Sequence, residues 1–393
     1  MSRKEFLPFS RPSIGQEEIE EVTDSLRSGW ITSGPKVQKF ESQFASFSGA
    51  PFAAAVNSAT SGLHIAYLTS GIQPGDEVIT TSLTFISTVS MILAAGGKPV
   101  LADIDPDTLN IDPEKIEAKI TSKTRAIVPV HFAGLPCAMD EILSIAKKHK
   151  LQVIEDAAHA LGAEYKGKKI GALSDTAVFS FHPIKNITTG EGGMVTTSDE
   201  KKYQELCLLR FHGMSKSAWK RYAKGGTPLY SIERLGFKYN MMDLQAALGI
   251  HQLKKLPAFN AERARQANIY DKAFSEIPEI RLQKSAPYPH VNSRHLYVII
   301  LEKNKLKISR DDFVAELGNM NIGTGIHFTA VHHHPYYSGI FPGADLPAAS
   351  HVSDHILSLP LYPGLKDEDI QDVMTAVMGL IKKHSKKTAV GIL

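Results

Sequence analysis

Residues 176–197 read TAVFSFHPIKNITTGEGGMVTT, and this stretch decides the fold. It begins with the apolar run TAVFSF and ends with a second short run, GMVTT, and both have the length and composition of buried strands. Between them lie Lys185 and a glycine-rich loop. Lysine is seldom buried, so a lysine that follows a buried-looking strand points to a special role.

Similar apolar runs precede this stretch, and amphipathic segments separate most of them. The runs are FAAAV (52–56), EVIT (77–80), KPVLADI (98–104), RAIVPV (125–130) and LQVIED (151–156). Alternation of strand-like and helical segments is typical of a largely parallel sheet with helices on both faces. The predicted fold class is therefore α/β.

The pattern changes after about residue 255. A long polar helix is predicted over 257–277, a strand over HLYVIIL (295–301), and two more helices over 309–318 and 366–382. With 393 residues and roughly 100–200 residues per domain, two domains are expected. We assign residues 1–255 to a large domain and 256–393 to a small α+β domain, on which the N-terminal segment can also pack.

Composition and charge narrow the class of protein. Hydrophobic residues make up 43% and charged residues 22%, as in a soluble globular protein. The net charge of +3 is dispersed, and the short basic clusters carry no interleaved aromatics, so an anionic small molecule is favoured over nucleic acid as partner. The two cysteines have neither metal-binding nor redox spacing, and no run resembles a signal peptide or membrane span, so a cytoplasmic protein is expected.

Two charged residues stand where ligands gather in open α/β sheets, at the carboxyl ends of strands. Asp156 ends the run LQVIED, and His159 follows it. Asp156 could equally cap a helix over the following AAHAL. Lys185 lies 29 residues downstream, after the next apolar run, so the two side chains are expected to face one crevice.

A third element is the turn of small residues in NSATSG (57–62), before a helical pattern. Small residues let an anion approach the N–H groups at a helix start, so the turn can seat a phosphate, or it can be an ordinary helix cap. It lacks the glycine and lysine spacing of nucleotide and dinucleotide loops. Phe85, after the next strand, is either a core residue or a surface on which a flat ring stacks.

One cofactor uses all of these groups. Pyridoxal phosphate bonds covalently to a lysine, pairs its ring nitrogen with a carboxylate, and places its phosphate on helix N–H groups. The combination in one chain predicts a pyridoxal-phosphate enzyme.

The sequence also resembles a known family. The runs SGWITSGPK, NSATSGLHIA, EDAAHALGA, FSFHPIKNITTGEGG and GFKYNMMDLQAA resemble the pyridoxal-phosphate-dependent nucleotide-sugar aminotransferases of the aspartate-aminotransferase-like fold type I, from about residue 6 to residue 382. The resemblance implies that Lys185 is the cofactor lysine and proton shuttle. It also implies that Asp156 holds the ring nitrogen, that His159 contacts the 3-hydroxyl side, and that Phe85 stacks on the ring.

The same resemblance implies the other ligands of the cofactor. The phosphate would lie against Ala59, Thr60 and Ser180, with Asn240 reaching in from a neighbouring subunit. That arrangement implies a homodimer with shared active sites.

Within this family, FLPFSRPSIG, NIGTGIHF and SLPLYP resemble the branch that aminates a UDP-linked 4-keto-pentose with L-glutamate, yielding UDP-4-amino-4-deoxy-L-arabinose for lipid A of lipopolysaccharide. Segments similar to substrate-contacting segments suggest Trp30, Thr32, Lys238, His327 and Tyr336 as sugar-nucleotide contacts, although His327 could be a core histidine. The sequence departs from that branch in having Phe85 in place of tryptophan and in its histidine-rich segment VHHHPYY (331–337). His332, His333 and His334 are adjacent, so their side chains point to different faces and no metal site is expected.

Other functions stay open at this stage. The substrate can be a different nucleotide ketosugar, such as a 4-keto-6-deoxy hexose or a 3-keto sugar. A related dehydrating branch replaces the lysine with histidine, and Lys185 argues against it. A non-catalytic regulator would lack Lys185 or Asp156, and a nicotinamide dehydrogenase would need the glycine fingerprint that is missing here.

Overall fold

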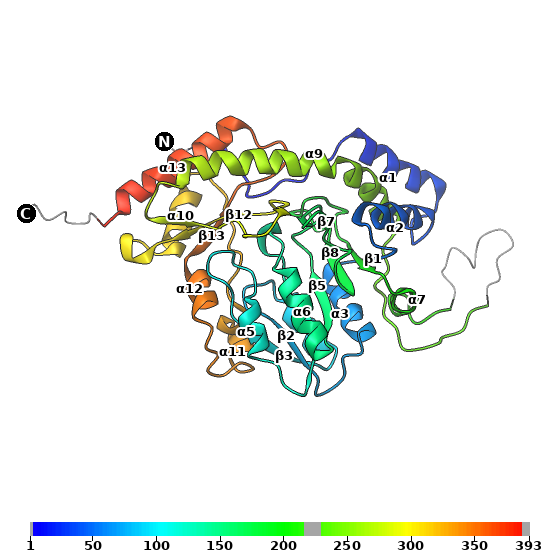
Figure 1. The fold of residues 1–393 in the computed structure, drawn as a ribbon. Helices are drawn as coiled ribbons and strands as arrows, with labels where there is room; N and C mark the ends of the chain where they lie inside the picture. Colours follow the sequence, from blue (N-terminus) through cyan, green and yellow to red (C-terminus); the bar gives the residue numbers. More distant parts are fainter. Residues whose placement is uncertain (1–2, 216–228, 387–393) are drawn as a thin grey trace, which may run out of the picture.

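The computed structural model describes residues 3–215 and 229–386, and a seven-stranded sheet lies at the centre of its larger part (Figure 1). The strands are β1 (Phe52–Val56), β2 (Glu77–Thr81), β3 (Lys98–Ala102), β4 (Thr124–Val128), β5 (Gln152–Asp156), β8 (Thr176–Ser180) and β9 (Gly193–Thr197). Their spatial order is β1-β9-β8-β5-β4-β2-β3, and β9 is antiparallel to both of its neighbours while the other pairs are parallel. The predicted strands and the α/β class are confirmed.

Helices cover both faces of this sheet because its strands are apolar on both sides. Along β8, Ala177 and Phe179 join one core while Val178 joins the opposite one. The first face is covered by α2 (Pro35–Ser48), α5 (Pro113–Glu117), α6 (Met139–His149) and the first half of α9 (Asp243–Phe274). The second face is covered by α3 (Ala59–Thr69), α4 (Ser87–Ala94) and α7 (Glu200–Leu209).

A second, antiparallel sheet forms near the C-terminal end of the chain. Its order is β10 (Ile280–Leu282), β12 (Tyr297–Leu301) and β13 (Ile356–Leu359). It shares a core with α10 (Arg310–Asn319), α13 (Asp367–His384) and the second half of α9. The N-terminal segment packs here, since the N–H of Leu7 donates to the carbonyl of Asn321 at 2.9 Å.

The remaining elements are short or peripheral. They are α1 (Gln16–Ser28), α11 (Pro335–Ser338), α12 (Pro347–His355), the 3-10 turns η1 (Phe132–Gly134), η2 (Lys303–Lys305) and η3 (Val331–His333), and a small sheet of β11 (His290–Val291), β6 (Glu164–Tyr165) and β7 (Lys168–Lys169).

The predicted helix over 257–277 was wrong at its start. Helix α9 begins at Asp243 and passes through Pro257 without ending. Proline favours the first turn of a helix, which is why the sequence suggested a start there. The lost backbone hydrogen bond is tolerated because Leu253 and Leu256, just before the proline, are buried in the core. As Figure 1 shows, α9 runs from α1 and α2 to α13, so the domain boundary predicted at residue 255 falls inside one continuous helix and stays a prediction.

The ends of several strands lie at one edge of the central sheet. Parallel strands β1, β2, β5 and β8 all end there, and β9 begins there, with Gly193 paired to both Val56 and Ser180. Any side chain that follows one of these strands is therefore delivered to the same edge.

Candidate active site

A cavity of about 450 Å³ opens at this edge of the sheet. Most of the residues predicted for the site line it, although they come from separate segments of the chain. They are Ala59, Thr60, Phe85, Asp156, His159, Ser180, Lys185 and His327.

Asp156 ends β5 and is 5% exposed. Its Oδ2 accepts a hydrogen bond from the hydroxyl of Thr88 at 2.7 Å, and its Oδ1 accepts one from the N–H of Ala158 at 3.2 Å. Residues 157–163 contain two short turns and no helix, so the alternative that Asp156 caps a helix is wrong. Burial raises the pKa of the Asp156 carboxyl, although the two hydrogen bonds and the charge of Lys185 oppose this effect.

Lys185 lies in a turn five residues beyond the last residue of β8, rather than at the strand end itself. Its side chain opens on the cavity, while the amine is surrounded by protein and lies 3.4 Å from Nε2 of His295. Burial lowers the pKa of Lys185 to about 8, against the opposing effect of the Asp156 charge. A base of this strength can accept a proton near neutral pH, which an ordinary lysine does poorly.

The lowered pKa predicts that Lys185→Met stabilises the cofactor-free protein at pH 7. The unfolded chain binds a proton at Lys185 up to about pH 10.5, whereas the folded chain releases it above about pH 8. The cost of holding the ammonium in the fold is therefore fully present below pH 8 and disappears as the pH rises toward 10.5. We expect Lys185→Met to raise the free energy of unfolding by about 1–3 kcal/mol at pH 7. This is less than the full pKa shift of Lys185 would imply, because the side chain opens on the cavity.

Urea unfolding of the cofactor-free protein at pH 7 and pH 10 measures this gain. Lys148→Met is the control, since the Lys148 side chain is 67% exposed and its replacement should change the stability by no more than about 0.5 kcal/mol. A Lys185→Met gain that does not shrink at pH 10 would contradict the argument.

The start of α3 faces the same cavity. Ser58 caps this helix by accepting from the N–H of Ser61, and the N–H of Gly62 donates to the carbonyl of Ser58. Because the first N–H groups of a helix have no intrahelical acceptor, those of Ala59 and Thr60 can bind an anion. A Cβ on Gly193 would lie 2.7 Å from the nitrogen of Ala59, so glycine there lets β9 approach this helix start.

Aromatic rings form another part of the wall. Phe85 is 57% exposed although residues 81–84 before it are buried, which fits a stacking surface better than a core residue. The His159 ring stacks on Phe328 with centroids 5.7 Å apart, and His327 also lines the cavity. Burial keeps the pKa of His159 well below its usual value and lowers that of His327 to about 3, so both imidazoles are neutral.

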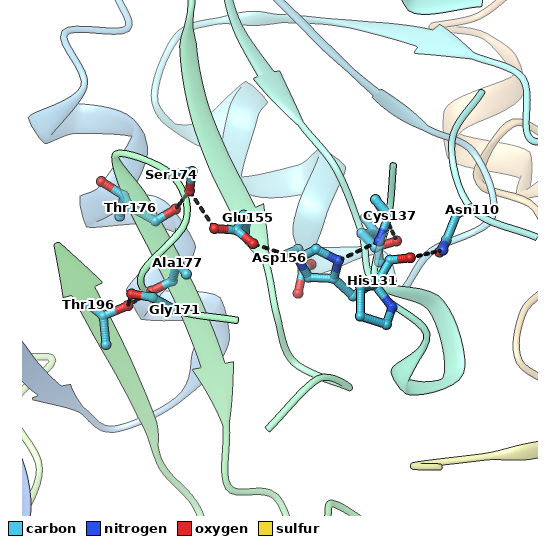
Figure 2. A network of polar contacts seen from close by, with 12 residues as sticks. Asn110, His131, Cys137, Glu155, Asp156, Gly171, Ser174, Thr176, Ala177 and Thr196 are labelled. Carbon is cyan, nitrogen blue, oxygen red and sulfur yellow. Dashed lines mark hydrogen bonds and ion pairs between the residues drawn. The ribbon is translucent and has the colours of Figure 1, made fainter. Parts of the chain in front are cut away.

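A buried polar network lies beside Asp156. Figure 2 shows the Glu155 carboxylate between Ser174 and His131, at 2.5 Å and 2.7 Å. The Nδ1 atom of His131 accepts from the N–H of Cys137, so Nε2 carries the proton and donates to Glu155. Since neighbouring residues of a strand point to opposite faces, this network fixes the end of β5 while Asp156 faces the cavity.

Four other predicted residues lie together outside this cavity. The Asn240 amide donates to Ser33 Oγ at 2.6 Å, Lys238 Nζ donates to Asn240 at 2.7 Å, and the Trp30 indole donates to the Ser33 carbonyl. The carbonyl of Thr32 accepts from the N–H of Asp243 at the start of α9. Asn240 lines a larger, separate hollow of about 600 Å³, which contains neither Lys185 nor Asp156.

The histidine-rich segment lies apart from the cavity lining. Tyr336 is 72% exposed. His332 is held by Ser82 and Ser350, at 2.6 Å and 2.9 Å, and His333 lies 3.7 Å from Asp354. In residues 3–215 and 229–386, no group of three His, Cys, Asp or Glu side chains is placed to hold a metal.

Sequence reasoning missed three residues that the fold brings to this site. Thr88 orients Asp156, Phe328 covers His159, and His295 contacts the Lys185 amine. Thr88 had a possible signal, since it follows Phe85 by one helical turn. His295 had none, because it approaches Lys185 from 110 residues away.

The residues of the cavity fit pyridoxal phosphate. An amine, a buried carboxylate, the N–H groups of a helix start and an exposed aromatic ring share one volume. In addition, Nδ1 of His159 is buried with no hydrogen-bond partner in the described part of the chain.

None of the helices in residues 3–215 and 229–386 is long and apolar enough to cross a membrane.

The chain is similar to known proteins along nearly its whole length. The chain is 49% identical to the spore coat polysaccharide biosynthesis protein SpsC of Bacillus subtilis, over 97% of this chain and 98% of that protein. Spr1654 of Streptococcus pneumoniae in its PLP form superposes with a TM-score of 0.89 at 32% identity, covering 96% of this chain and 99% of that one. Helicobacter pylori PseC, an aminotransferase involved in the biosynthesis of pseudoaminic acid, has a TM-score of 0.88 at 32% identity, covering 97% of this chain and 100% of that one.

The DegT/DnrJ/EryC1/StrS aminotransferase family model matches residues 12–378. The chain therefore belongs to that family and is a pyridoxal-phosphate-dependent sugar aminotransferase of fold type I.

Proposed function

We propose that this protein transfers the amino group of L-glutamate to a nucleotide-linked 4-keto sugar, with Lys185 as the catalytic residue. The observation that carries the proposal is the meeting of the Lys185 amine, the Asp156 carboxylate and the start of α3 in one cavity. When bound, pyridoxal phosphate supplies an electron sink for the carbon that loses its proton.

The chain's own groups then have separate tasks. The N–H groups of Ala59 and Thr60, with Ser180 beside them, would bind the phosphate, and the Asp156 carboxylate would keep the proton on the ring nitrogen. Phe85 would cover the ring, and His159 would contact its 3-hydroxyl side. These contacts orient the reacting carbon toward Lys185 and exclude water from it.

Lys185 moves the proton. In the first half of the reaction its Nζ would take the proton from the α-carbon of glutamate; water would then supply the keto oxygen of the 2-oxoglutarate that leaves, and the amino group would stay in the site for transfer. In the second half Nζ returns a proton to the sugar carbon that receives the nitrogen. The pKa of about 8 makes both directions accessible near neutral pH.

A second subunit would complete the site in this proposal. Asn240, Lys238, Trp30 and Thr32 form one compact cluster that does not line the cavity of its own chain. We propose that the protein is a homodimer in which the partner's copy of this cluster contacts the phosphate and the nucleotide sugar. His327 and Tyr336 would also contact the nucleotide sugar. A cytoplasmic location stays a prediction.

The first candidate substrate is UDP-4-keto-pentose, which would place the product in lipid A modification. It is supported by the resemblance of FLPFSRPSIG, NIGTGIHF and SLPLYP to the arabinose branch. The second candidate is another nucleotide ketosugar, such as a 4-keto-6-deoxy hexose. It is supported by the similarity to PseC and SpsC, which serve pseudoaminic acid and spore coat polysaccharide biosynthesis.

A substrate panel tests the proposal. The purified enzyme is given glutamate with UDP- and dTDP-linked 4-keto-pentose, 4-keto-6-deoxy hexose and 3-keto sugars, and 2-oxoglutarate release is followed. We expect ping-pong kinetics and a kcat/KM at least about 100-fold higher for one ketosugar, because a site built to bind specific hydroxyls rejects analogues that leave its polar groups unpaired. If glutamate is converted to 2-oxoglutarate but no ketosugar accepts the amino group, the proposal that a nucleotide ketosugar is the acceptor is wrong.

A further inference from the structure

His295 contacts the amine of Lys185 but has no role in the proposed function. It precedes β12 of the second sheet, is 2% exposed, and places its Nε2 3.4 Å from Nζ of Lys185. The contact joins the C-terminal part of the chain to the turn after β8. Neither residue is near the other in sequence, so the geometry is created by the fold alone.

The backbone around His295 is held on several sides. Ser293 donates its hydroxyl to the carbonyl of His159, and the Asn186 amide donates to the carbonyl of Ser293, both at 2.8 Å. The guanidinium of Arg263 donates to the His295 carbonyl at 3.1 Å. The imidazole is therefore presented to Lys185 from a fixed position.

The groups that face this imidazole keep it uncharged. Its ring lies 4.3 Å from that of His159, and the charges of Lys185 and Arg263 add to the effect of burial, which lowers the pKa of His295 well below its usual value. His327 adds to the same lowering of the pKa of His295, and the carboxylate whose charge acts on Lys185 is Asp156. In the described residues, Nδ1 of His295 has no hydrogen-bond partner, which is unfavourable for a residue that serves packing alone.

We propose that His295 is a positioning residue whose Nε2 accepts a hydrogen bond from the Lys185 amine whenever that amine is not bonded to the cofactor. Such a bond occupies one hydrogen of the amine and leaves the nitrogen lone pair free to face the cavity. The inference rests on the role of Lys185 in the proposed function.

The lone pair is what covalent capture of the cofactor requires. The Lys185 nitrogen forms a C=N bond with the aldehyde carbon, and the aldehyde oxygen leaves as water with the two protons of the neutral amine. With a pKa of about 8, part of the amine is neutral near pH 7, and a fixed orientation of that neutral amine favours its attack on the aldehyde carbon.

The test distinguishes a His295 that orients the Lys185 amine from a His295 that only supports the structure of the site. Cofactor-free wild type, His295→Asn and His295→Gln are compared in two measurements without any sugar. One is the affinity for pyridoxamine phosphate, which has no aldehyde. The other is the rate at which pyridoxal phosphate is captured, followed by absorbance and by borohydride reduction with peptide mapping. The Gln carbonyl can occupy the place of Nε2, whereas Asn reaches only the place of Nδ1.

We expect His295→Asn to capture pyridoxal phosphate about tenfold more slowly, the effect of one lost hydrogen bond, with pyridoxamine phosphate affinity unchanged within about twofold. His295→Gln should recover most of the rate. His290→Gln is the control, because His290 is bonded to Ser285 and Tyr288, away from the cavity, and should match wild type in both measurements.

Two results would overturn the proposal. One is a His295→Asn capture rate equal to that of wild type. The other is a parallel loss of affinity and rate in both variants, which would mean a structural role. If wild type is reduced at a lysine other than Lys185, the catalytic assignment fails and this inference fails with it. A failure of the sugar panel leaves these measurements unaffected.

Discussion

Lys185→Ala is expected to lower the rate of the glutamate half-reaction by at least about 10³-fold, within the range for loss of a positioned acid–base group. Alanine removes the amine with the lowered pKa, and no other lysine lines the cavity formed by the described residues. His159 and His327 line it too, but their low pKa values make them weak bases. The variant should also lose the borohydride-trapped covalent adduct. Single-turnover release of 2-oxoglutarate measures the effect.

The control for this variant is Lys148→Ala at the surface, which should retain the wild-type rate. Added methylamine provides a second check, since a small free amine can carry the proton in place of Lys185. Partial recovery with methylamine would show that the fold and the cofactor site are intact. Turnover by Lys185→Ala at the wild-type rate without any added amine would refute the assignment.

Asp156→Asn is expected to lower kcat by about 10²–10³-fold, the usual cost of removing one group that stabilises developing charge in a buried site. The substitution keeps the shape of the side chain and one acceptor oxygen for Thr88 or Ala158. It removes the negative charge that would hold a proton on the ring nitrogen. We also expect weaker cofactor binding, measured by equilibrium dialysis of pyridoxal phosphate.

The surface variant Asp140→Asn serves as the control, since the Asp140 side chain is 57% exposed. Thr88→Val provides an intermediate case, because it leaves the Asp156 charge in place but removes the hydroxyl that orients Oδ2. Its loss of activity should be smaller than that of Asp156→Asn. An Asp156→Asn enzyme with unchanged kcat would mean that another group holds the ring nitrogen.

Much of the fold could be predicted because strands have a local signature. Runs such as TAVFSF and LQVIED are short, apolar and bounded by polar residues, and each became a strand of the central sheet. The position of β9 was not predictable in this way. Its antiparallel placement between β1 and β8 depends on pairing between segments far apart in sequence.

The error at α9 has a local cause. Pro257 has the appearance of a helix start, and only the burial of Leu253 and Leu256 shows why the helix continues through it. Turn residues after Asp156 likewise resembled a helix, because AAHAL has good helix formers. In both places tertiary packing overrode local propensity.

The residues of the candidate site also fall into a group that could be predicted from the sequence and a group that could not. Lys185, Asp156, Phe85 and the start of α3 could be predicted because each follows a strand, and parallel strands deliver such residues to one edge. His295 and Phe328 could not, because their positions depend on how the C-terminal part of the chain packs on that edge.

The sequence by itself determined the fold class, and it predicted a cofactor lysine after one buried strand and a carboxylate at the end of another. These follow from short-range patterns of apolar and polar residues, which act within a few positions along the chain. The tertiary structure alone decided that a neutral histidine meets the lysine amine and that the Asn240 amide donates to Ser33. Contacts of this kind join residues more than a hundred positions apart, and only packing of the complete chain determines which side chains meet.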